Sequence, residues 1–174
     1  YNLFRHRMIT PIIDLRGNVI AFGGRVLDDS KPKYINSPET VVYKKSRTLF
    51  ALNIAKRSTS RRYILCEGYM DVISMHQAGF DTAVCACGTA LTPEQVKLIG
   101  EYADEVILSY DSDEAGQKAA ARSLELFAPS PARVSVLNIP GAKDPDEFIK
   151  KFGRDRFEML LNGTANATEF KLAK

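Results

Sequence analysis

At 174 residues, the chain is long enough for one compact domain, or for one domain with a smaller piece attached. Its composition, 45% hydrophobic and 26% charged, is typical of a globular protein and excludes a disordered chain. No apolar run approaches the roughly 20 residues that span a bilayer, so we expect no membrane partner. The chain opens on Tyr1 without an initiator Met or a signal peptide, which we interpret as a piece of a longer protein.

Basic side chains are concentrated in the first third of the chain. The net charge is only +3, yet thirteen Lys and Arg residues precede Glu67, against four Asp and Glu residues. The acidic clusters follow later. A basic surface facing an acidic, metal-binding pocket suits a polyanionic substrate, whereas the same charges on a solvated surface would only add solubility.

The three cysteines, Cys66, Cys85 and Cys87, lie in apolar, strand-like runs. An odd number of cysteines without a secretory signal predicts buried, reduced thiols in a cytoplasmic protein. Cys85-Ala86-Cys87 lacks the second Cys or His pair that a zinc site requires, so we expect no zinc here. His6 and His76 are isolated from any ligand spacing and are interpreted as structural.

The first fifty residues predict a small basic unit that begins with a hairpin. Two apolar runs, 8–14 and 18–25, flank a short Gly-containing turn. Pro11 favours an edge position for the first strand. Gly23-Gly24 predicts a bulge or a close backbone approach that re-aims Arg25.

A loop and a helix are predicted next. Residues 31–40 contain two prolines together with Lys33 and Tyr34, a composition typical of surface loops that also fits contact with phosphates and bases. The spacing of apolar residues predicts an amphipathic helix over 48–57. Ser58-Thr59-Ser60 is the expected joint with the rest of the chain.

From Tyr63 onward, predicted strands and helices alternate, which is typical of an α/β fold with a parallel sheet and crossover helices. The sequence predicts strands over 63–66, 81–87, 105–110 and 133–139, and helices over 69–78, 94–102, 114–127, 146–151, 154–161 and 168–174. Thr92 is the expected N-cap of the second helix, with Pro93 at its first position.

Acidic residues follow three of the predicted strands. Glu67 ends the first, Asp111 and Asp113 follow the third, and Asp144 and Asp146 follow the fourth. Parallel strands deliver their carboxyl ends to one edge of the sheet, where ligand sites lie in open α/β folds. Carboxylates gathered there are hard oxygen ligands for one or two Mg²⁺ or Mn²⁺ ions, which serve phosphoryl and nucleotidyl transfer.

Several of these residues also have simpler interpretations. Glu67 either ligates the metal or acts as a general base or acid for a hydroxyl proton. Asp113 is also a candidate N-cap of the next helix, and Asp144 a candidate turn residue before a proline. Gly88-Thr89 follows a buried strand, where its backbone N–H groups would meet a phosphate or shape the pocket floor.

Six ordered motifs resemble the Toprim core of bacterial DnaG-type primases together with the basic region that precedes it. They span nearly the whole chain: Phe22-Gly23-Gly24-Arg25, Pro32-Lys33-Tyr34-Ile35-Asn36-Ser37-Pro38-Glu39-Thr40, Glu67-Gly68-Tyr69-Met70-Asp71, Gly88-Thr89-Ala90-Leu91-Thr92, Asp111-Ser112-Asp113-Glu114-Ala115-Gly116 and Lys143-Asp144-Pro145-Asp146. The acids alone are shared by other Toprim enzymes, whereas the first two motifs point to a primase.

The resemblance implies a Toprim-type parallel sheet with flanking helices over 61–146, a smaller basic α+β subdomain over 1–60, and short C-terminal helices over 147–174. It implies synthesis of RNA primers from ribonucleoside triphosphates on a single-stranded DNA template, by nucleotidyl transfer that uses Mg²⁺ or Mn²⁺. Glu67 would be the catalytic glutamate. Asp111, Asp113 and Asp144 would be metal ligands, with Asp71 and Asp146 in support. Nucleotides, template and primer would contact Arg25, Lys33, Tyr34, Lys45, Asp71, Gly88 and Thr89.

The family also implies parts that this chain lacks. A zinc-binding module, part of the polymerase domain and a domain that contacts the replicative helicase would lie outside it, and we expect a monomer. The chain departs from the family pattern after Lys45, where Ser46-Arg47-Thr48-Leu49-Phe50-Ala51 replaces a more usual Gly-x-x-Leu-Tyr-Gly. The alternatives are another Toprim nucleic-acid enzyme, such as a phage primase-helicase or a nuclease, or a non-catalytic Toprim binding module.

Overall fold

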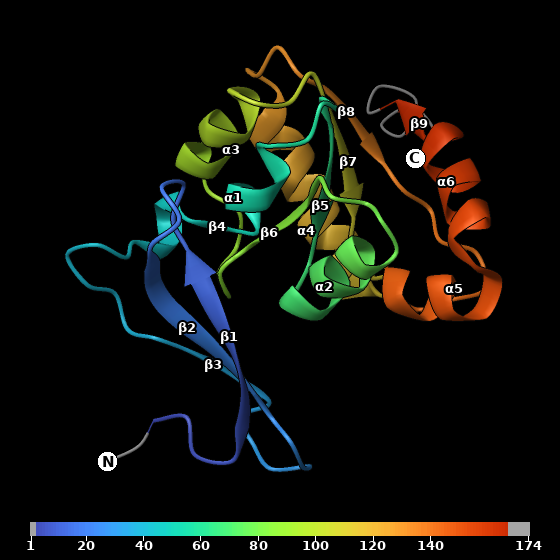
Figure 1. Ribbon diagram of the computed structural model, residues 1–174. Helices are drawn as coiled ribbons and strands as arrows, with labels where there is room; N and C mark the ends of the chain where they lie inside the picture. The colour runs from blue at the N-terminus through green and yellow to red at the C-terminus, as the bar shows by residue number, and fades with distance from the viewer. Residues whose placement is uncertain (1–2, 167–174) are drawn as a thin grey trace.

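The computed structural model describes residues 3–166, which form a three-stranded antiparallel sheet and a six-stranded mixed sheet (Figure 1). The smaller sheet extends from the main body, and the larger one lies between two layers of helices. No helix within the described residues is both long and apolar enough to cross a membrane.

The smaller sheet contains the predicted hairpin, β1 (Arg7–Ile13) and β2 (Val19–Val26), with β1 at the edge. Asp14 closes the turn, because its Oδ1 accepts hydrogen bonds from the backbone N–H groups of Arg16 and Asn18. The structure adds β3 (Tyr34–Asn36), which pairs with β2 where we predicted only a loop. That prediction was wrong because three residues between prolines show no apolar alternation, and the pairing depends on a partner far away in the sequence.

The larger sheet has the order β4-β6-β5-β7-β8-β9. Its four inner strands are mutually parallel, as predicted, and the two edge strands are antiparallel. The strands span β4 (Leu49–Phe50), β5 (Arg62–Cys66), β6 (Ala83–Ala86), β7 (Glu105–Ser109), β8 (Arg133–Val136) and β9 (Ala165–Asn166).

The predicted helix over 48–57 is wrong. A 3₁₀ turn, η1 (Lys45–Arg47), leads into β4, and only the short α1 (Leu52–Ala55) is helical. Ala51 separates them with φ 65°, a left-handed conformation that a continuous helix does not contain. Leu49 and Phe50 pair with β6 and are both buried, so long-range pairing overrides the local helical spacing.

Side chains of the central strands alternate between two cores. Tyr63 and Leu65 of β5 pack on one face with α3 (Pro93–Gly100) and α4 (Glu114–Phe127). Ile64 and Cys66 pack on the other face with α2 (Tyr69–Gln77), α5 (Pro145–Phe152) and α6 (Arg154–Asn162). Burial on both faces explains why these strands show continuous apolar runs.

Helix boundaries follow the predicted caps closely. Thr92 caps α3, because its Oγ1 accepts a hydrogen bond from Gln95 N at 3.2 Å. Helix α4 spans the predicted residues 114–127. The helix predicted over 168–174 lies outside the described residues. The subdivision at residues 60 and 146 stays a prediction, although β4 pairs with the central sheet from before the first boundary.

Candidate functional site at the carboxyl edge of the sheet

The two central strands of the large sheet lead to the site. Strands β5 and β7 are neighbours, and the chain leaves them in opposite directions, through α2 to β6 and through α4 to β8. Helices α2 and α4 cover opposite faces, so the carboxyl ends of β5 and β7 flank a topological switch point, where a crevice forms. Glu67 follows β5 and Asp111 follows β7, which places both acids at this crevice.

Hydrogen bonds hold these strand ends together. Glu67 Oε2 accepts a hydrogen bond from the backbone N–H of Asp111 at 3.2 Å. One turn into α2, Asp71 Oδ2 accepts one from the backbone N–H of Gly68, also at 3.2 Å. The helix start and the two strand ends therefore form one fixed acidic frame.

The acids in this frame repel one another. Burial, followed by the charges of Asp111 and Asp144, raises the pKa of Asp71 from 3.8 to about 7. Burial, followed by the charges of Glu67 and Asp144, raises the pKa of Asp111 to about 6. Groups with such displaced pKa values in a cleft are candidates for function, and a bound cation would relieve the repulsion.

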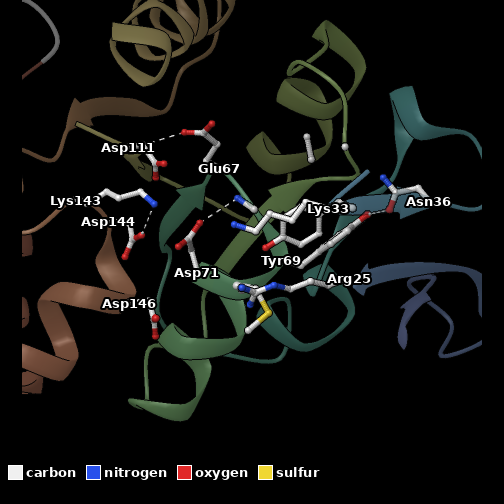
Figure 2. A pocket seen from close by; sticks show the side chains of 15 residues that line it. Arg25, Lys33, Asn36, Glu67, Tyr69, Asp71, Asp111, Lys143, Asp144 and Asp146 are labelled. Atoms are coloured by element: carbon white, nitrogen blue, oxygen red, sulfur yellow. Dashed lines mark hydrogen bonds and ion pairs between the residues drawn. The ribbon is translucent and has the colours of Figure 1, made fainter. Parts of the chain in front are cut away.

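A pocket of about 420 Å³ opens over the acids and is closed on the other side by the small sheet (Figure 2). It is lined by Arg25, Lys33, Tyr34, Asn36, Glu67, Gly68, Tyr69, Met70, Asp71, Ala86, Gly88, Asp111, Lys143, Asp144 and Asp146.

The basic wall of the pocket comes from β2 and from the segment that ends in β3. The guanidinium carbon of Arg25 lies 5.9 Å from the centre of the Tyr34 ring, and the Lys33 ammonium lies 5.8 Å from it. Cation–π contacts with the same aromatic ring hold the two cations near each other. The two cations thus face the carboxylates across the pocket. This arrangement suits a phosphate chain that contacts Arg25 and Lys33 directly and the carboxylates through a bound metal cation.

Asn36 and Tyr69 join the two walls. The Tyr69 hydroxyl donates to Asn36 Oδ1 at 2.9 Å, and Asn36 Nδ2 donates to the carbonyl of Cys87 at 3.3 Å. Gly88 has φ +71°, and a Cβ built there would lie 2.1 Å from Asn36 Nδ2. A side chain at Gly88 would be strained and would displace Asn36, so glycine suits this position, and Gly88 lines the pocket.

The pocket does not include every residue that we predicted for the site. Asp113 Oδ1 accepts a hydrogen bond from Gly116 N at 2.8 Å, so it is the N-cap of α4 and does not line the pocket. Lys45 and Thr89 do not line it either. Asp144 lines it, and its Oδ1 also caps α5 by accepting from Glu147 N at 2.8 Å.

Both carboxylate oxygens of Asp146 have protein partners. Ser74 Oγ donates to Oδ1 at 2.6 Å, and Lys150 Nζ lies 2.6 Å from Oδ2. Burial alone would raise the pKa of Asp146, but these hydrogen bonds outweigh it and hold the pKa below its usual value. Asp146 therefore ties α5 to α2 at the rim of the pocket.

From the sequence we quoted three lining residues within motifs without giving them a role: Lys143, Asn36 and Tyr69. Lys143 is the first residue of an acidic motif, and its charge beside Asp144 was the available signal. Asn36 and Tyr69 matter because β3 folds against α2, which no local pattern reveals. The cysteines are buried free thiols as predicted, and His76 Nε2 lies 2.9 Å from the carbonyl oxygen of Ala83, a structural contact.

The donor set suits a hard divalent cation that is shared with a substrate. Among residues 3–166, no three His, Cys, Asp or Glu side chains are arranged so that they could hold a metal ion by themselves. Mg²⁺ is usually bound by one or two carboxylates together with water and substrate phosphates. Asp111 and Asp144, beside Glu67, supply such carboxylates on the acidic side of the pocket.

Two family models match the chain. Residues 1–56 match the N-terminal domain of the DNA primase catalytic core, and residues 64–149 match a Toprim-like domain. The boundary between the two matches falls between the basic first third and the parallel sheet.

The chain is similar to bacterial primases along almost its full length. A DNA primase of Clostridium acetobutylicum is 46% identical over 173 residues, covering 99% of this chain and 29% of the relative. The E. coli primase catalytic core superposes with a TM-score of 0.93 at 38% identity, covering 99% of this chain and 57% of that one. A DnaG primase catalytic domain bound to single-stranded DNA gives a TM-score of 0.89 at 38% identity, covering 95% of this chain and 54% of that one. The chain thus spans under a third of the length of the Clostridium relative.

Proposed function

Because the chain belongs to the catalytic-core family of DnaG-type DNA primases, we propose that it carries the nucleotidyl-transfer site of a bacterial primase. The reaction would join ribonucleoside triphosphates into a short RNA primer on a single-stranded DNA template. The observation that supports this most directly is the pocket in which Glu67, Asp111 and Asp144 face Arg25 and Lys33.

Each wall of the pocket has its own role in this proposal. Asp111 and Asp144 would hold Mg²⁺ or Mn²⁺, which supplies charge neutralisation at the reacting phosphate. Arg25 and Lys33 would bind the triphosphate, and Tyr34 would hold their side chains in place. Binding from both sides would orient the phosphate chain. Such positioning supplies a large part of the rate enhancement in phosphoryl transfer.

Glu67 has two roles that agree with its position. It lies beside Asp111 at the end of β5, and one of its oxygens already accepts a hydrogen bond from Asp111 N. The other oxygen is available to ligate the cation, or to take the proton of an attacking 3′-hydroxyl. Asp71 also lines the pocket, where it accepts a hydrogen bond from the backbone of Gly68 and would add negative charge once it is ionised.

The remaining activities of a primase need parts outside these residues. Since the chain spans 29% of its Clostridium relative, we expect metal and triphosphate binding from it rather than complete primer synthesis. Contact with a replicative helicase, and the single-stranded template that a related catalytic domain binds, are part of the proposal for the whole protein. Bacterial relatives fit a role in replication in the cytoplasm.

The test is a calorimetric titration of the chain with Mn²⁺ and Mg²⁺, followed by a ribonucleoside triphosphate. We expect wild type to bind metal, and bound metal to enable triphosphate binding. In Asp111→Asn, the affinities for metal and for triphosphate should both fall by about tenfold or more. Asp104→Asn is the matched control, because Asp104 precedes β7 at the opposite edge of the sheet and pairs with Arg61. If wild type and Asp111→Asn bind alike, the acidic edge is not the site, and a non-catalytic binding module becomes the better interpretation.

A further inference from the structure

Lys143 is a cation on the acidic side of the pocket, in the loop between β8 and α5. Its backbone is fixed at two points. Its N–H donates to Glu147 Oε2 at 2.9 Å, and its carbonyl accepts from the backbone N–H of Ser112 at 3.3 Å. The loop is therefore held against the segment that follows β7 and carries Asp111.

The side chain of Lys143 is far less constrained than its backbone. It is 68% exposed, and its ammonium group lies 3.9 Å from Asp144 Oδ2, toward which it points in Figure 2. Its charge also opposes the rise in the pKa of Asp111 that burial and neighbouring carboxylates cause. Lys143 thus partly neutralises Asp111 and Asp144 from a flexible stem.

Among the described residues, the other cations that line the pocket are Arg25 and Lys33, which stand on the opposite wall against Tyr34. The Lys143 ammonium instead lies 3.9 Å from one oxygen of Asp144, a carboxylate that would also attract a divalent ion. Two cations at one pair of carboxylates repel each other, so binding of a metal favours movement of the ammonium group away. An ammonium on four methylene groups can swing to a nearby phosphate, where it is an effective point charge.

We propose that Lys143 is an internal counter-cation of Asp111 and Asp144. A divalent metal displaces its ammonium group, which then binds the triphosphate of the incoming nucleotide. The inference rests on the proposed function of this pocket. It adds a third phosphate-binding cation, contributed by the same loop that carries Asp144. Lys143 would make metal binding and nucleotide binding depend on each other, because its charge opposes the first and favours the second.

The experiment compares Lys143→Gln and Lys143→Arg with wild type, using Mn²⁺ alone and then a ribonucleoside triphosphate at saturating Mn²⁺. Lys118→Gln is the control, because Lys118 pairs with Glu114 on the surface of α4 and is 72% exposed. We expect Lys143→Gln to bind Mn²⁺ about two- to fivefold more tightly, as befits the loss of one exposed like charge. We expect the same variant to bind triphosphate about tenfold more weakly, while Lys143→Arg and Lys118→Gln remain close to wild type in that step.

Opposite changes in the two affinities support the inference, because a purely structural role would weaken both or neither. Equal Mn²⁺ affinity, or equal triphosphate affinity, in Lys143→Gln and wild type overturns it while leaving the proposed function intact. A parallel loss of both affinities also overturns it. Failure of wild type to bind Mn²⁺ overturns the proposed function and this inference together.

Discussion

The hydroxyl of Tyr69 donates a hydrogen bond to Oδ1 of Asn36 at 2.9 Å and so connects the first turn of α2 to β3. Tyr69 is buried at the base of the acidic frame, and Asn36 belongs to the strand that also contains Tyr34. The distance between the basic and acidic walls of the pocket therefore depends on this pair.

We predict that Tyr69→Phe costs about 0.5–1.5 kcal/mol of unfolding free energy, the usual net value of one such hydrogen bond. It should also weaken triphosphate binding several-fold, because Lys33 and Tyr34 would no longer be fixed relative to the acids. Urea denaturation and triphosphate titration measure the two effects. The control is Ser135→Ala on β8, which removes the partly buried hydrogen bond that Ser135 donates to Thr164 and should lower stability without changing triphosphate affinity. Equal triphosphate affinities for Tyr69→Phe and wild type would show that the pair does not position the basic wall.

Gly116, in the first turn of α4, allows the backbone of Asp111 to pass close to the helix. A Cβ built on Gly116 would lie 2.1 Å from the Asp111 carbonyl oxygen and 2.8 Å from its carbonyl carbon. Backbone atoms cannot rotate aside, so Gly116→Ala should cost about 1–3 kcal/mol and displace Asp111. We expect Mn²⁺ affinity to fall by an order of magnitude in the calorimeter.

Gly100→Ala is the matched control for this substitution, because it lies at the end of α3, where its Cβ would meet only Ser130 Oγ at 3.8 Å. Alanine is the better helix former, so this change should be neutral or stabilising by about 0.4–1 kcal/mol. Unchanged metal affinity in Gly116→Ala would mean that the position of Asp111 is unimportant for the site.

The parallel sheet was predictable because burial on both faces leaves a continuous apolar run in the sequence. Glu105–Ser109 shows such a run, and the acid that follows it necessarily lies at the carboxyl edge. Leu49 and Phe50 show the limit of this argument. Their spacing also fits a helix, and only pairing with β6, together with the left-handed conformation of Ala51, makes them a strand.

The acids at the site were predictable as a group but not one by one. Asp111 and Asp113 both follow β7, yet Asp111 lines the pocket while Asp113 turns back to cap α4. An acid after a buried strand can either line a pocket or cap the next helix, and the local sequence permits both. The direction of each side chain depends on where α4 docks against the sheet. Lys143 could not be assigned for the same reason, because its position comes from the packing of the α5 loop against Ser112.

Substitution of Asp146 tests whether this residue holds α5 against α2 or binds the metal. Both of its oxygens are engaged, by Ser74 and Lys150, so we predict that Asp146→Asn lowers stability by about 1–3 kcal/mol and leaves Mn²⁺ affinity within about twofold of wild type. Ser74→Ala removes one of the same contacts from the α2 side and should have a smaller effect of the same kind. Thermal unfolding and calorimetry distinguish the two effects. A tenfold loss of Mn²⁺ affinity in Asp146→Asn, with Ser74→Ala unaffected, would make Asp146 a metal ligand.

Asp71 should make the metal-free protein less stable at higher pH. Its pKa is about 7 in the folded chain, against an ordinary value of 3.8, so between these values the folded state keeps a proton that the unfolded state has lost. The free energy of unfolding therefore falls as the pH rises from about 4 to 7. We predict that Asp71→Asn, which removes this charge, is more stable than wild type at pH 8 in the presence of a chelator by about 1–3 kcal/mol, and by much less at pH 5. Urea denaturation at the two pH values measures this difference in stability.

Asp14→Asn is the control with the opposite sign, because hydrogen bonds, the largest of them from Asn18, lower the pKa of Asp14. Its loss of stability should be equal at pH 5 and pH 8, because both lie above the ordinary pKa. An equal gain for Asp71→Asn at both pH values would show that Asp71 is already ionised at pH 5, and the acidic frame would then carry its charge without the repulsion that we infer.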